Sequence, residues 1–438
     1  MRKVDVLIIG AGLAGLAAAS RLGARCLVLE AEDEPGGACR SLRAGSSVYD
    51  YTGHLLHLRR EETRELVGRL LPDAFNLVER RAAVWSQGCF VPYPFQANFH
   101  PLPLPAVREC LLGYLRAREA ALTAGAEERS RVRTFGQWAL ATFGDGICNH
   151  FMFPYNSKVF RAEPDEMSAD WVSWSVPRPD LETVVDGALG STAEGLGYNP
   201  SFLYPKEGGI EALPRALAAE AEREGAQVLL RQRVSLVDPG KRTVITDSGG
   251  CYQYVRLIST APLPKLLEYL HVADERPALW ASLLRWVGVY NLNLTLRRAA
   301  PWPWQWLYLP GGRLRCYRVG VATNFSPALA PRGCMAVYTE ISYQPGEADD
   351  DERLREAVLN DLRLIGLLRD RDRIVDEAAV RIEPAYVVHD PWRAANIELI
   401  HAWLAERGII STGRWGAWTY GGMEDAINQG LEAAERSV

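Results

Sequence analysis

Residues 4–15 read VDVLIIGAGLAG, and this stretch decides the fold. Its first six residues form a mostly apolar, β-branched run, which is typical of a buried parallel strand. The glycines that follow lead directly into the small-residue segment 16–22, so the G-x-G-x-x-G pattern stands between a strand and a helix. Gly10 permits the tight turn, Gly12 admits a pyrophosphate to the backbone, and Gly15 lets the helix pack on the strand. The stretch therefore predicts a Rossmann unit whose helix N-terminus faces phosphates.

The segment after this unit bears on whether the bound dinucleotide is NAD or FAD. A second short strand, residues 26–29, ends at Glu30, where an acid is expected to accept hydrogen bonds from ribose hydroxyls. NAD as the sole ligand is one interpretation. The pair Gly36-Gly37, which precedes Arg40 and Ser41, favours the other, because it resembles the second motif of the glutathione-reductase and amine-oxidase class of flavoproteins. In that class only glycines let the chain pass so close to the FAD diphosphate. We therefore expect noncovalently bound FAD.

Later segments predict how the chain is divided into domains. Residues 255–262 and 408–414 each read as a strand that ends in small residues, as expected of returns to the nucleotide sheet. The last helix starts near Glu424 and Asp425, and its positive end is expected at the flavin. The prediction is an α/β fold: a discontinuous Rossmann-type FAD-binding domain, an inserted helical cap and an antiparallel β-sheet substrate domain. The FAD-binding domain is expected at 1–80, 205–265 and 400–438. The helical cap is expected at 100–200, and the substrate domain at 80–100 and 270–400.

Composition excludes several classes of function. The net charge is -5 and no basic block occurs, so nucleic acid is not an expected partner. No apolar run reaches the ~18–20 residues that span a bilayer, and no C-x-x-C pair suggests a metal site. We expect a cytoplasmic protein with reduced thiols, no membrane association and no metal.

Five further stretches carry a resemblance to a known family. They are YTGH at 51–54, FVPYPFQAN at 90–98, FMFPYNSKVF at 151–160, WLYLP at 306–310 with Arg318 and NFSP behind it, and GRWGAWTY at 413–420. In this order they are similar to motifs of the flavin-dependent UDP-galactopyranose mutases, especially the eukaryotic type. The likeness runs nearly end to end.

The resemblance implies a reaction and a set of site residues. In that family N5 of reduced FAD attacks the anomeric carbon and expels the nucleotide diphosphate, and the sugar recloses in its other ring form without net redox change. The implied catalytic residues are Arg318, Tyr308, Tyr420 and His54. With the glycine motifs, the expected cofactor residues are Gly10, Gly12, Gly15, Glu30, Gly37, Arg40, Ser41, Gly53, Arg414, Glu424 and Asp425. The implied substrate residues are Gln96, Phe151, Tyr155, Asn156, Phe160 and Asn199, and Arg178 is a candidate.

The chain departs from the family at three places. A second phosphate-binding arginine is replaced by Ser175; Arg178 is the candidate substitute, although the prolines on both sides restrict it. A phosphate-contacting tyrosine is matched by Asp390, which would repel a diphosphate. An asparagine–glutamine pair is matched by Glu424-Asp425.

These departures leave three functions open. The first is a mutase acting on a nucleotide-activated sugar or deoxysugar, with NAD(P)H or a reductase as electron donor. The second is an FAD-dependent oxidase or dehydrogenase acting on a sugar-like or amine metabolite. The third is a decayed flavoprotein that serves as a partner subunit.

Overall fold

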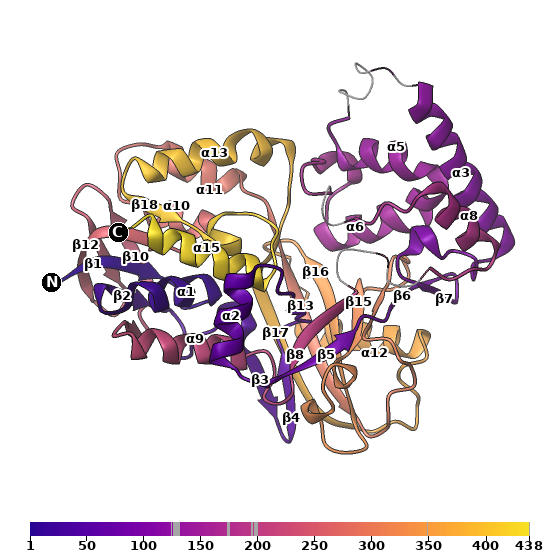
Figure 1. Cartoon of the computed structure of the whole chain (residues 1–438), viewed down its shortest axis with the longest axis horizontal. Coiled ribbons are helices and arrows are strands. Elements are labelled where there is room, and N and C mark those ends of the chain that lie inside the picture. Colours follow the sequence, from indigo (N-terminus) through magenta and orange to yellow (C-terminus); the bar gives the residue numbers. More distant parts are fainter. Residues whose placement is uncertain are drawn as a thin grey trace.

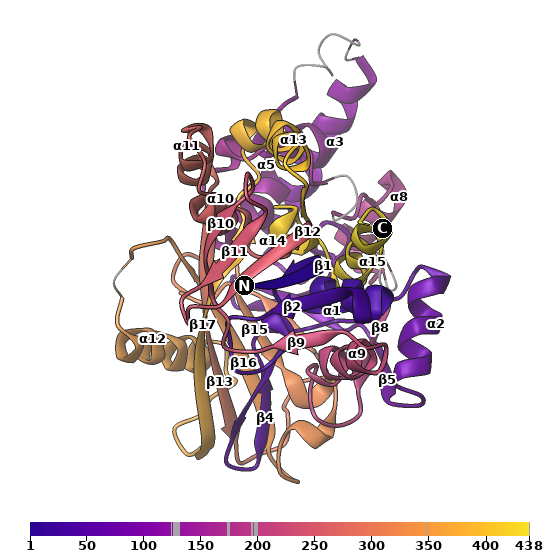
Figure 2. The same cartoon turned by 90° about the vertical axis from the view of Figure 1, so that its left-hand side faces the viewer.

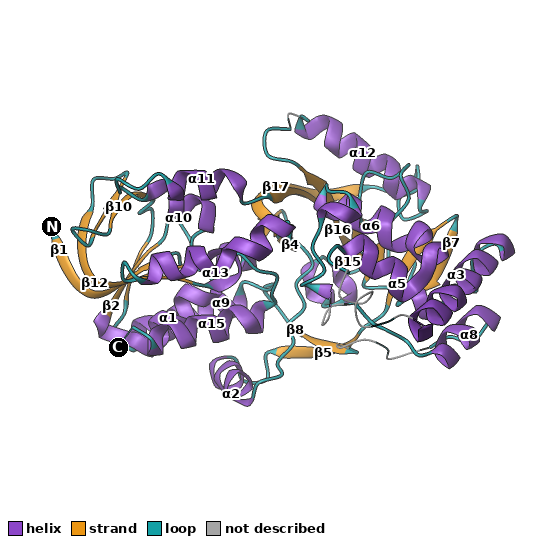
Figure 3. Cartoon of the chain, turned by 90° about the horizontal axis from the view of Figure 1, so that it is seen from above, coloured by secondary structure: helices purple, strands orange, loops and turns teal. Residues whose placement is uncertain are grey.

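The computed structural model describes residues 1–123, 125, 132–172, 176–193, 196, 200–347 and 349–437. It confirms the predicted fold class, because a mainly parallel sheet, an antiparallel sheet and a group of helices follow one another through the molecule (Figure 1). Seen from above, the nucleotide sheet and the helical group lie at opposite ends, with the second sheet between them (Figure 3).

The first sheet has the order β10-β11-β12-β1-β2-β9, and β18 also pairs with β12. Its central strands are parallel, and Ile9, Leu29, Ser259 and Ser411 end them at the same edge. The residues that follow these strands therefore meet at the carboxyl edge, where open α/β sheets bind ligands. The strands are β1 Arg2–Ile9, β2 Cys26–Leu29, β9 Gln227–Leu229, β10 Val234–Asp238, β11 Thr243–Thr246, β12 Cys251–Ser259 and β18 Ile409–Ser411.

Helices cover both faces of this sheet. Apolar side chains of α1, α9 and α15 pack on one face, and those of α10, α11 and α13 pack on the other. Figure 2 shows α1 and α15 beside the central strands. The helices are α1 Leu13–Leu22, α9 Ala212–Arg223, α10 Leu263–Tyr269, α11 Arg276–Leu283, α13 Pro391–Ala405 and α15 Met423–Glu435; α2, Glu61–Leu70, lies beside α9 and α15.

The second sheet has the order β17-β13-β16-β15-β14-β6-β7 and is antiparallel except between β14 and β6. Strand β16 is buried along its whole length, and α12, Asp351–Leu364, packs on the sheet. The strands are β6 Ala82–Ser86, β7 Cys89–Pro92, β13 Trp286–Leu296, β14 Trp306–Tyr308, β15 Arg318–Val321, β16 Met335–Tyr343 and β17 Ile374–Val387.

The helical group lies over one end of the second sheet. Its aromatic side chains form one core with residues of the sheet. It contains α3 Leu104–Thr123, α5 Phe135–Ile147, α6 Phe153–Phe160 and α8 Leu181–Leu189. Two small strand pairs complete the fold, β3 Ser41–Ala44 with β4 Ser47–Asp50 and β5 Phe75–Glu79 with β8 Ser201–Pro205. Among the described residues, no helix is both long and apolar enough to cross a membrane.

Candidate active site

A cavity lies between the carboxyl edge of the nucleotide sheet and the second sheet. Residues from seven separate stretches of the chain line it. The lining includes Gly12, Leu13, Gly36, Gly37, Gly53, His54, His57, Arg59, Thr260, Arg318, Tyr386, Arg414, Tyr420, Gly422, Glu424 and Asp425. Most of the glycines and charged residues expected from the sequence thus meet in one place.

The glycine loop has the shape that a dinucleotide needs. A Cβ on Gly15 would lie 1.9 Å from the Gly10 carbonyl oxygen, so close helix–strand packing requires glycine there. A Cβ on Gly12 would meet only Gly37 Cα, at 3.9 Å, and would otherwise project into open space. No side chain caps the N-terminus of α1, whose first residue, Leu13, lines the cavity. The uncapped amides and the facing glycines fit a diphosphate.

Glu30 stands behind this loop and is buried. One carboxylate oxygen accepts a hydrogen bond from the Ala11 amide at 2.6 Å and the other accepts one from the Glu32 amide at 3.0 Å. Arg40 donates from Nε to the Gly37 carbonyl at 3.2 Å, and Ser41 donates to Asp50 at 2.7 Å. Arg40 therefore supports the second glycine turn, whereas Ser41 links strands β3 and β4, and neither residue belongs to the cavity lining.

His54 lines the cavity. Burial lowers its pKa, although the nearby Asp50 carboxylate opposes this effect. Its Nδ1 lies 3.1 Å from the Thr52 carbonyl oxygen, which only accepts, so Nδ1 is the donor in this hydrogen bond. Gly53 is needed beside it, because a Cβ there would lie 2.3 Å from the Tyr338 hydroxyl.

Three polar residues form a row across the second sheet. Tyr308 on β14 faces Arg318 on β15, and Arg318 faces Glu340 on β16. The Arg318 guanidinium donates from Nε to Glu340 Oε1 at 3.0 Å and from Nη2 to Oε2 at 2.7 Å. Glu340 is fully buried and also accepts a hydrogen bond from the Tyr317 hydroxyl. The pair holds the Arg318 side chain in one orientation at the cavity wall.

Aromatic rings connect this row to the helical group. The Tyr155 ring lies 5.2 Å from the Tyr308 ring, edge to face, and Phe151 stacks on Tyr155 at 5.4 Å. Burial raises the pKa of Tyr155 well above its usual value, so this phenol remains a hydrogen-bond donor. Phe151 and Phe160 both belong to the apolar core under the helices.

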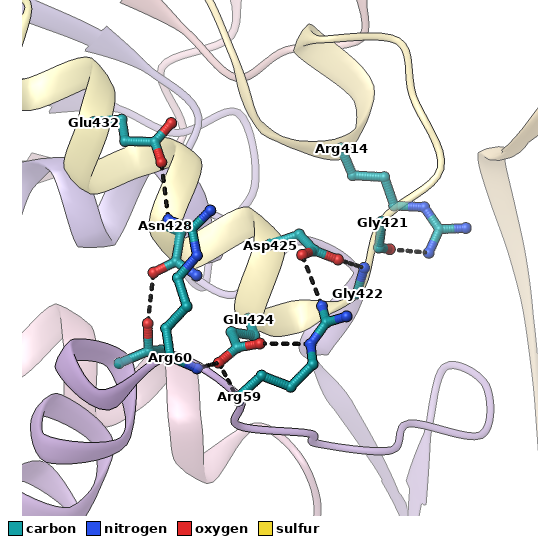
Figure 4. Close-up of polar contacts among 10 residues, drawn as sticks. Arg59, Arg60, Arg414, Gly421, Gly422, Glu424, Asp425, Asn428 and Glu432 are labelled. Atoms are coloured by element: carbon teal, nitrogen blue, oxygen red, sulfur yellow. Dashed lines mark hydrogen bonds and ion pairs between the residues drawn. The ribbon is translucent and has the colours of Figure 1, made fainter. Parts of the chain in front are cut away.

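Arg414 and Tyr420 also line the cavity. The Arg414 guanidinium lies 5.2 Å from the Tyr420 ring centre and 5.4 Å from that of Tyr386, and the two rings stack on each other. Arg414 also donates to the Gly421 carbonyl at 3.1 Å (Figure 4). It thereby fixes the turn that leads into α15.

Glu424 and Asp425 occupy the first turn of α15 and line the cavity. Glu424 accepts hydrogen bonds from the backbone amides of Arg59 and Arg60 and from the Arg59 side chain (Figure 4). Asp425 accepts from the Gly422 amide at 2.7 Å and from Arg59 at 3.0 Å. The acids that depart from the family pattern therefore have a cationic partner.

The remaining expected substrate residues lie farther from the cavity. Gln96 is buried and donates to the Pro177 carbonyl at 2.6 Å, and Asn156 donates to the Met152 carbonyl within its helix. The Arg178 guanidinium lies over the Trp138 ring at 5.1 Å, and the side chain is exposed. Asn199 and Ser175 lie outside the described residues.

Asp390 does not face the cavity. It is buried at the start of α13, where its carboxylate accepts the Arg393 amide at 2.7 Å. The expectation that Asp390 repels a bound diphosphate therefore fails, because this carboxylate caps a helix instead. Among the residues that the structure describes, no group of His, Cys, Asp and Glu has the arrangement of a metal site.

A family model for flavin-containing amine oxidoreductases matches residues 13–437. The chain belongs to this family. Its cofactor is accordingly FAD, which agrees with the open glycine loop and the uncapped α1 N-terminus.

Solved structures of similar flavoproteins span more than one kind of reaction. Reduced UDP-galactopyranose mutase matches with a TM-score of 0.92 and 28% identity, covering 100% of this chain and 94% of the mutase chain. A putrescine oxidase variant matches with a TM-score of 0.67 at 15% identity, over 100% and 99% of the two chains. A fatty acid isomerase from P. acnes matches with a TM-score of 0.65 at 17% identity, over 99% and 98%. The last two show only the shared fold.

One curated relative matches over a shorter stretch. Ferredoxin--NADP reductase 1 of Christiangramia forsetii is 32% identical over 114 residues, 24% of this chain. The chain spans about a third of the length of that relative, 32%. This match covers too little of either chain to indicate a shared activity.

Sequence reasoning missed several residues of this flavoenzyme site. Thr260 follows β12 at the carboxyl edge, a position that could have identified it. Four other residues belong to no recognisable sequence motif. The tertiary fold places His57, Arg59 and Tyr386 in the cavity lining and places Glu340 against Arg318.

Proposed function

We propose that this enzyme interconverts the pyranose and furanose forms of a nucleotide-activated sugar or deoxysugar, with reduced FAD as the active form. The observation that carries the proposal is the cross-strand row of Tyr308, Arg318 and Glu340, of which Arg318 lines the FAD cavity. The whole-chain similarity to reduced UDP-galactopyranose mutase supports it.

The row suits a diphosphate leaving group. Glu340 and Tyr386 accept from Nε and Nη2 of Arg318, whereas Nη1 donates to none of the described residues. A guanidinium held in one orientation presents its remaining N–H groups without reorganisation. The Tyr308 phenol stands next to it on the neighbouring strand. Together they would stabilise the negative charge that develops when a nucleotide diphosphate departs.

Other residues of the chain would orient the sugar. When bound in its reduced form, FAD supplies the nucleophile for the anomeric carbon. His54, whose pKa is lowered by burial, offers its Nε2 to the sugar, and Tyr420 offers a phenol from the cavity lining. Reduction of FAD before the first turnover requires an electron donor, and we propose NAD(P)H or a reductase.

A second candidate function is oxidation of a sugar-like or amine metabolite. The Arg318 charge is compensated by buried Glu340, and Arg178 lies over Trp138 rather than in the cavity lining. Both features reduce the positive charge available to a diphosphate and favour a less anionic substrate. Membership of the amine oxidoreductase family agrees with this alternative.

Titration of the reduced enzyme with UDP, GDP and TDP separates the two functions. The mutase proposal expects micromolar binding of at least one diphosphate. We expect Tyr308→Phe, which removes one hydroxyl donor, to weaken that binding by about tenfold or less, as is typical of a neutral hydrogen bond. Absence of binding by the wild-type enzyme at millimolar concentration would leave the oxidoreductase as the better account.

A further inference from the structure

Arg59 bridges two walls of the cavity. It belongs to the segment between His54 and α2, whereas Glu424 and Asp425 belong to the first turn of α15. Its Nε donates to Glu424 at 3.0 Å and its Nη2 donates to Asp425 at 3.0 Å (Figure 4). All three residues line the cavity. We call this group the Arg59 clasp.

The clasp leaves one negative charge at the cavity wall, from two carboxylates and one guanidinium. Glu424 is only 3% exposed and lies in the first turn of α15. Arg59 is more accessible, with 54% of its side chain exposed. Without Arg59, two carboxylates would face the cavity with no described cation within ion-pair distance, because no other described residue makes an ion pair with Glu424 or Asp425.

This balance matters because the charge of the cofactor changes with its redox state. Two electrons and one proton convert neutral isoalloxazine into its anionic reduced form, so reduction adds one negative charge. A nearby cation favours that charge and a nearby carboxylate disfavours it. We infer that the Arg59 clasp sets the reduction potential of the bound FAD, with Arg59 as a positioning residue that keeps the acid pair compatible with the reduced cofactor. The inference rests on FAD binding and holds for either proposed reaction.

A purely mechanical role makes a different prediction. If Arg59 only ties two walls together, its loss weakens binding of oxidised and reduced FAD equally and leaves the potential unchanged. A charge effect changes the ratio of the two affinities, which is what the potential measures. Arg60 provides a matched control, because it is the next residue and pairs with Glu432 at 3.0 Å, but neither residue of that pair lines the cavity.

The test is the two-electron midpoint potential of the FAD-loaded enzyme. Xanthine with xanthine oxidase supplies the electrons, a reference dye reports the potential, and the buffer has low ionic strength. We expect Arg59→Met to lower the ratio of reduced to oxidised FAD at least tenfold at fixed potential, a fall of about 30 mV. Glu424→Gln should raise the potential, and Arg60→Met should leave it unchanged. Added salt should reduce the Arg59→Met shift, since the guanidinium is half exposed.

Two further variants complete the test. Arg59→Lys keeps the charge and should keep the wild-type potential. The triple variant Arg59→Met/Glu424→Gln/Asp425→Asn removes both signs of charge and should return the potential toward wild type. If Arg59→Met does not retain FAD, the midpoint potential of Glu424→Gln is the deciding measurement. An unchanged potential in that variant overturns the inference. Equal losses of affinity for both redox forms in Arg59→Met would also overturn it.

Discussion

Arg318 and Glu340 lie directly opposite each other on β15 and β16, and Glu340 has no exposure to solvent. The guanidinium donates to both carboxylate oxygens, at 3.0 and 2.7 Å. The pair therefore has two functions: it supports the sheet and it orients the cation that we assign to the substrate. Any substitution of Arg318 affects both.

Arg318→Ala is expected to destabilise the enzyme by about 3–5 kcal/mol, because it leaves a buried carboxylate without its partner. Chemical denaturation measures this loss. The double variant Arg318→Met/Glu340→Gln should regain much of the stability and retain FAD, yet still fail to bind UDP. Recovery of nucleotide binding in the double variant would show that Arg318 serves only the sheet.

Gly12→Ala and Gly15→Ala should fail in different ways. A Cβ on Gly12 points into the cavity, so this variant should fold with near wild-type stability of the apoprotein and lose FAD. A Cβ on Gly15 meets the Gly10 carbonyl at 1.9 Å, so this variant should lose about 1–3 kcal/mol or more of folding stability. Flavin absorbance and denaturation of the apoproteins distinguish them. Full FAD retention by Gly12→Ala would place the diphosphate elsewhere.

Part of the fold was predictable because its signals are local. The strand–glycine–helix pattern at residues 4–22 is confirmed by β1 and α1, and the short strand expected at residues 26–29 is confirmed by β2. In each case the neighbours along the chain determine the element.

The site was less predictable because its partners are distant in sequence. Glu340 lies on β16, which is buried along its whole length, and its ion-pair partner among the described residues is Arg318, on the neighbouring strand. Glu424 and Asp425 suggested altered substrate contacts, until the fold brought Arg59 to them from more than 360 residues away. Charge compensation of this kind leaves no periodic signal in one sequence.

His57 should make stability depend on acidity. Burial lowers its pKa to about 4 from 6.5, partly offset by its hydrogen bond with the Ser201 carbonyl. Between pH 6.5 and 4 this imidazole binds a proton in the unfolded chain but not in the native enzyme. The free energy of unfolding therefore falls as the pH falls from 6.5 toward 4. One proton corresponds to a slope of at most about 1.4 kcal/mol per pH unit. His57→Asn should reduce the measured slope by up to this amount in urea titrations between pH 4 and 7, and an unchanged slope would contradict the assignment.

Arg178→Ala should change nucleotide affinity by less than about threefold, well short of the one to two decades expected for a lost phosphate contact. The reason is its position over Trp138, outside the cavity lining. Calorimetric titration of the reduced enzyme with UDP measures the effect, and Arg318→Met/Glu340→Gln provides the comparison. A loss as large as that of the Arg318 variant would mean that Arg178 reaches the substrate.

The most direct test of the central claim is to count products per flavin. The FAD-loaded enzyme is reduced once with dithionite, kept anaerobic and incubated with UDP-galactopyranose or a related nucleotide sugar, while chromatography follows the ring forms and absorbance follows the flavin. The account predicts many interconverted sugars per FAD while the flavin stays reduced. A product yield limited to one per flavin, reoxidation of the flavin by the sugar, or no conversion together with no diphosphate binding would contradict it.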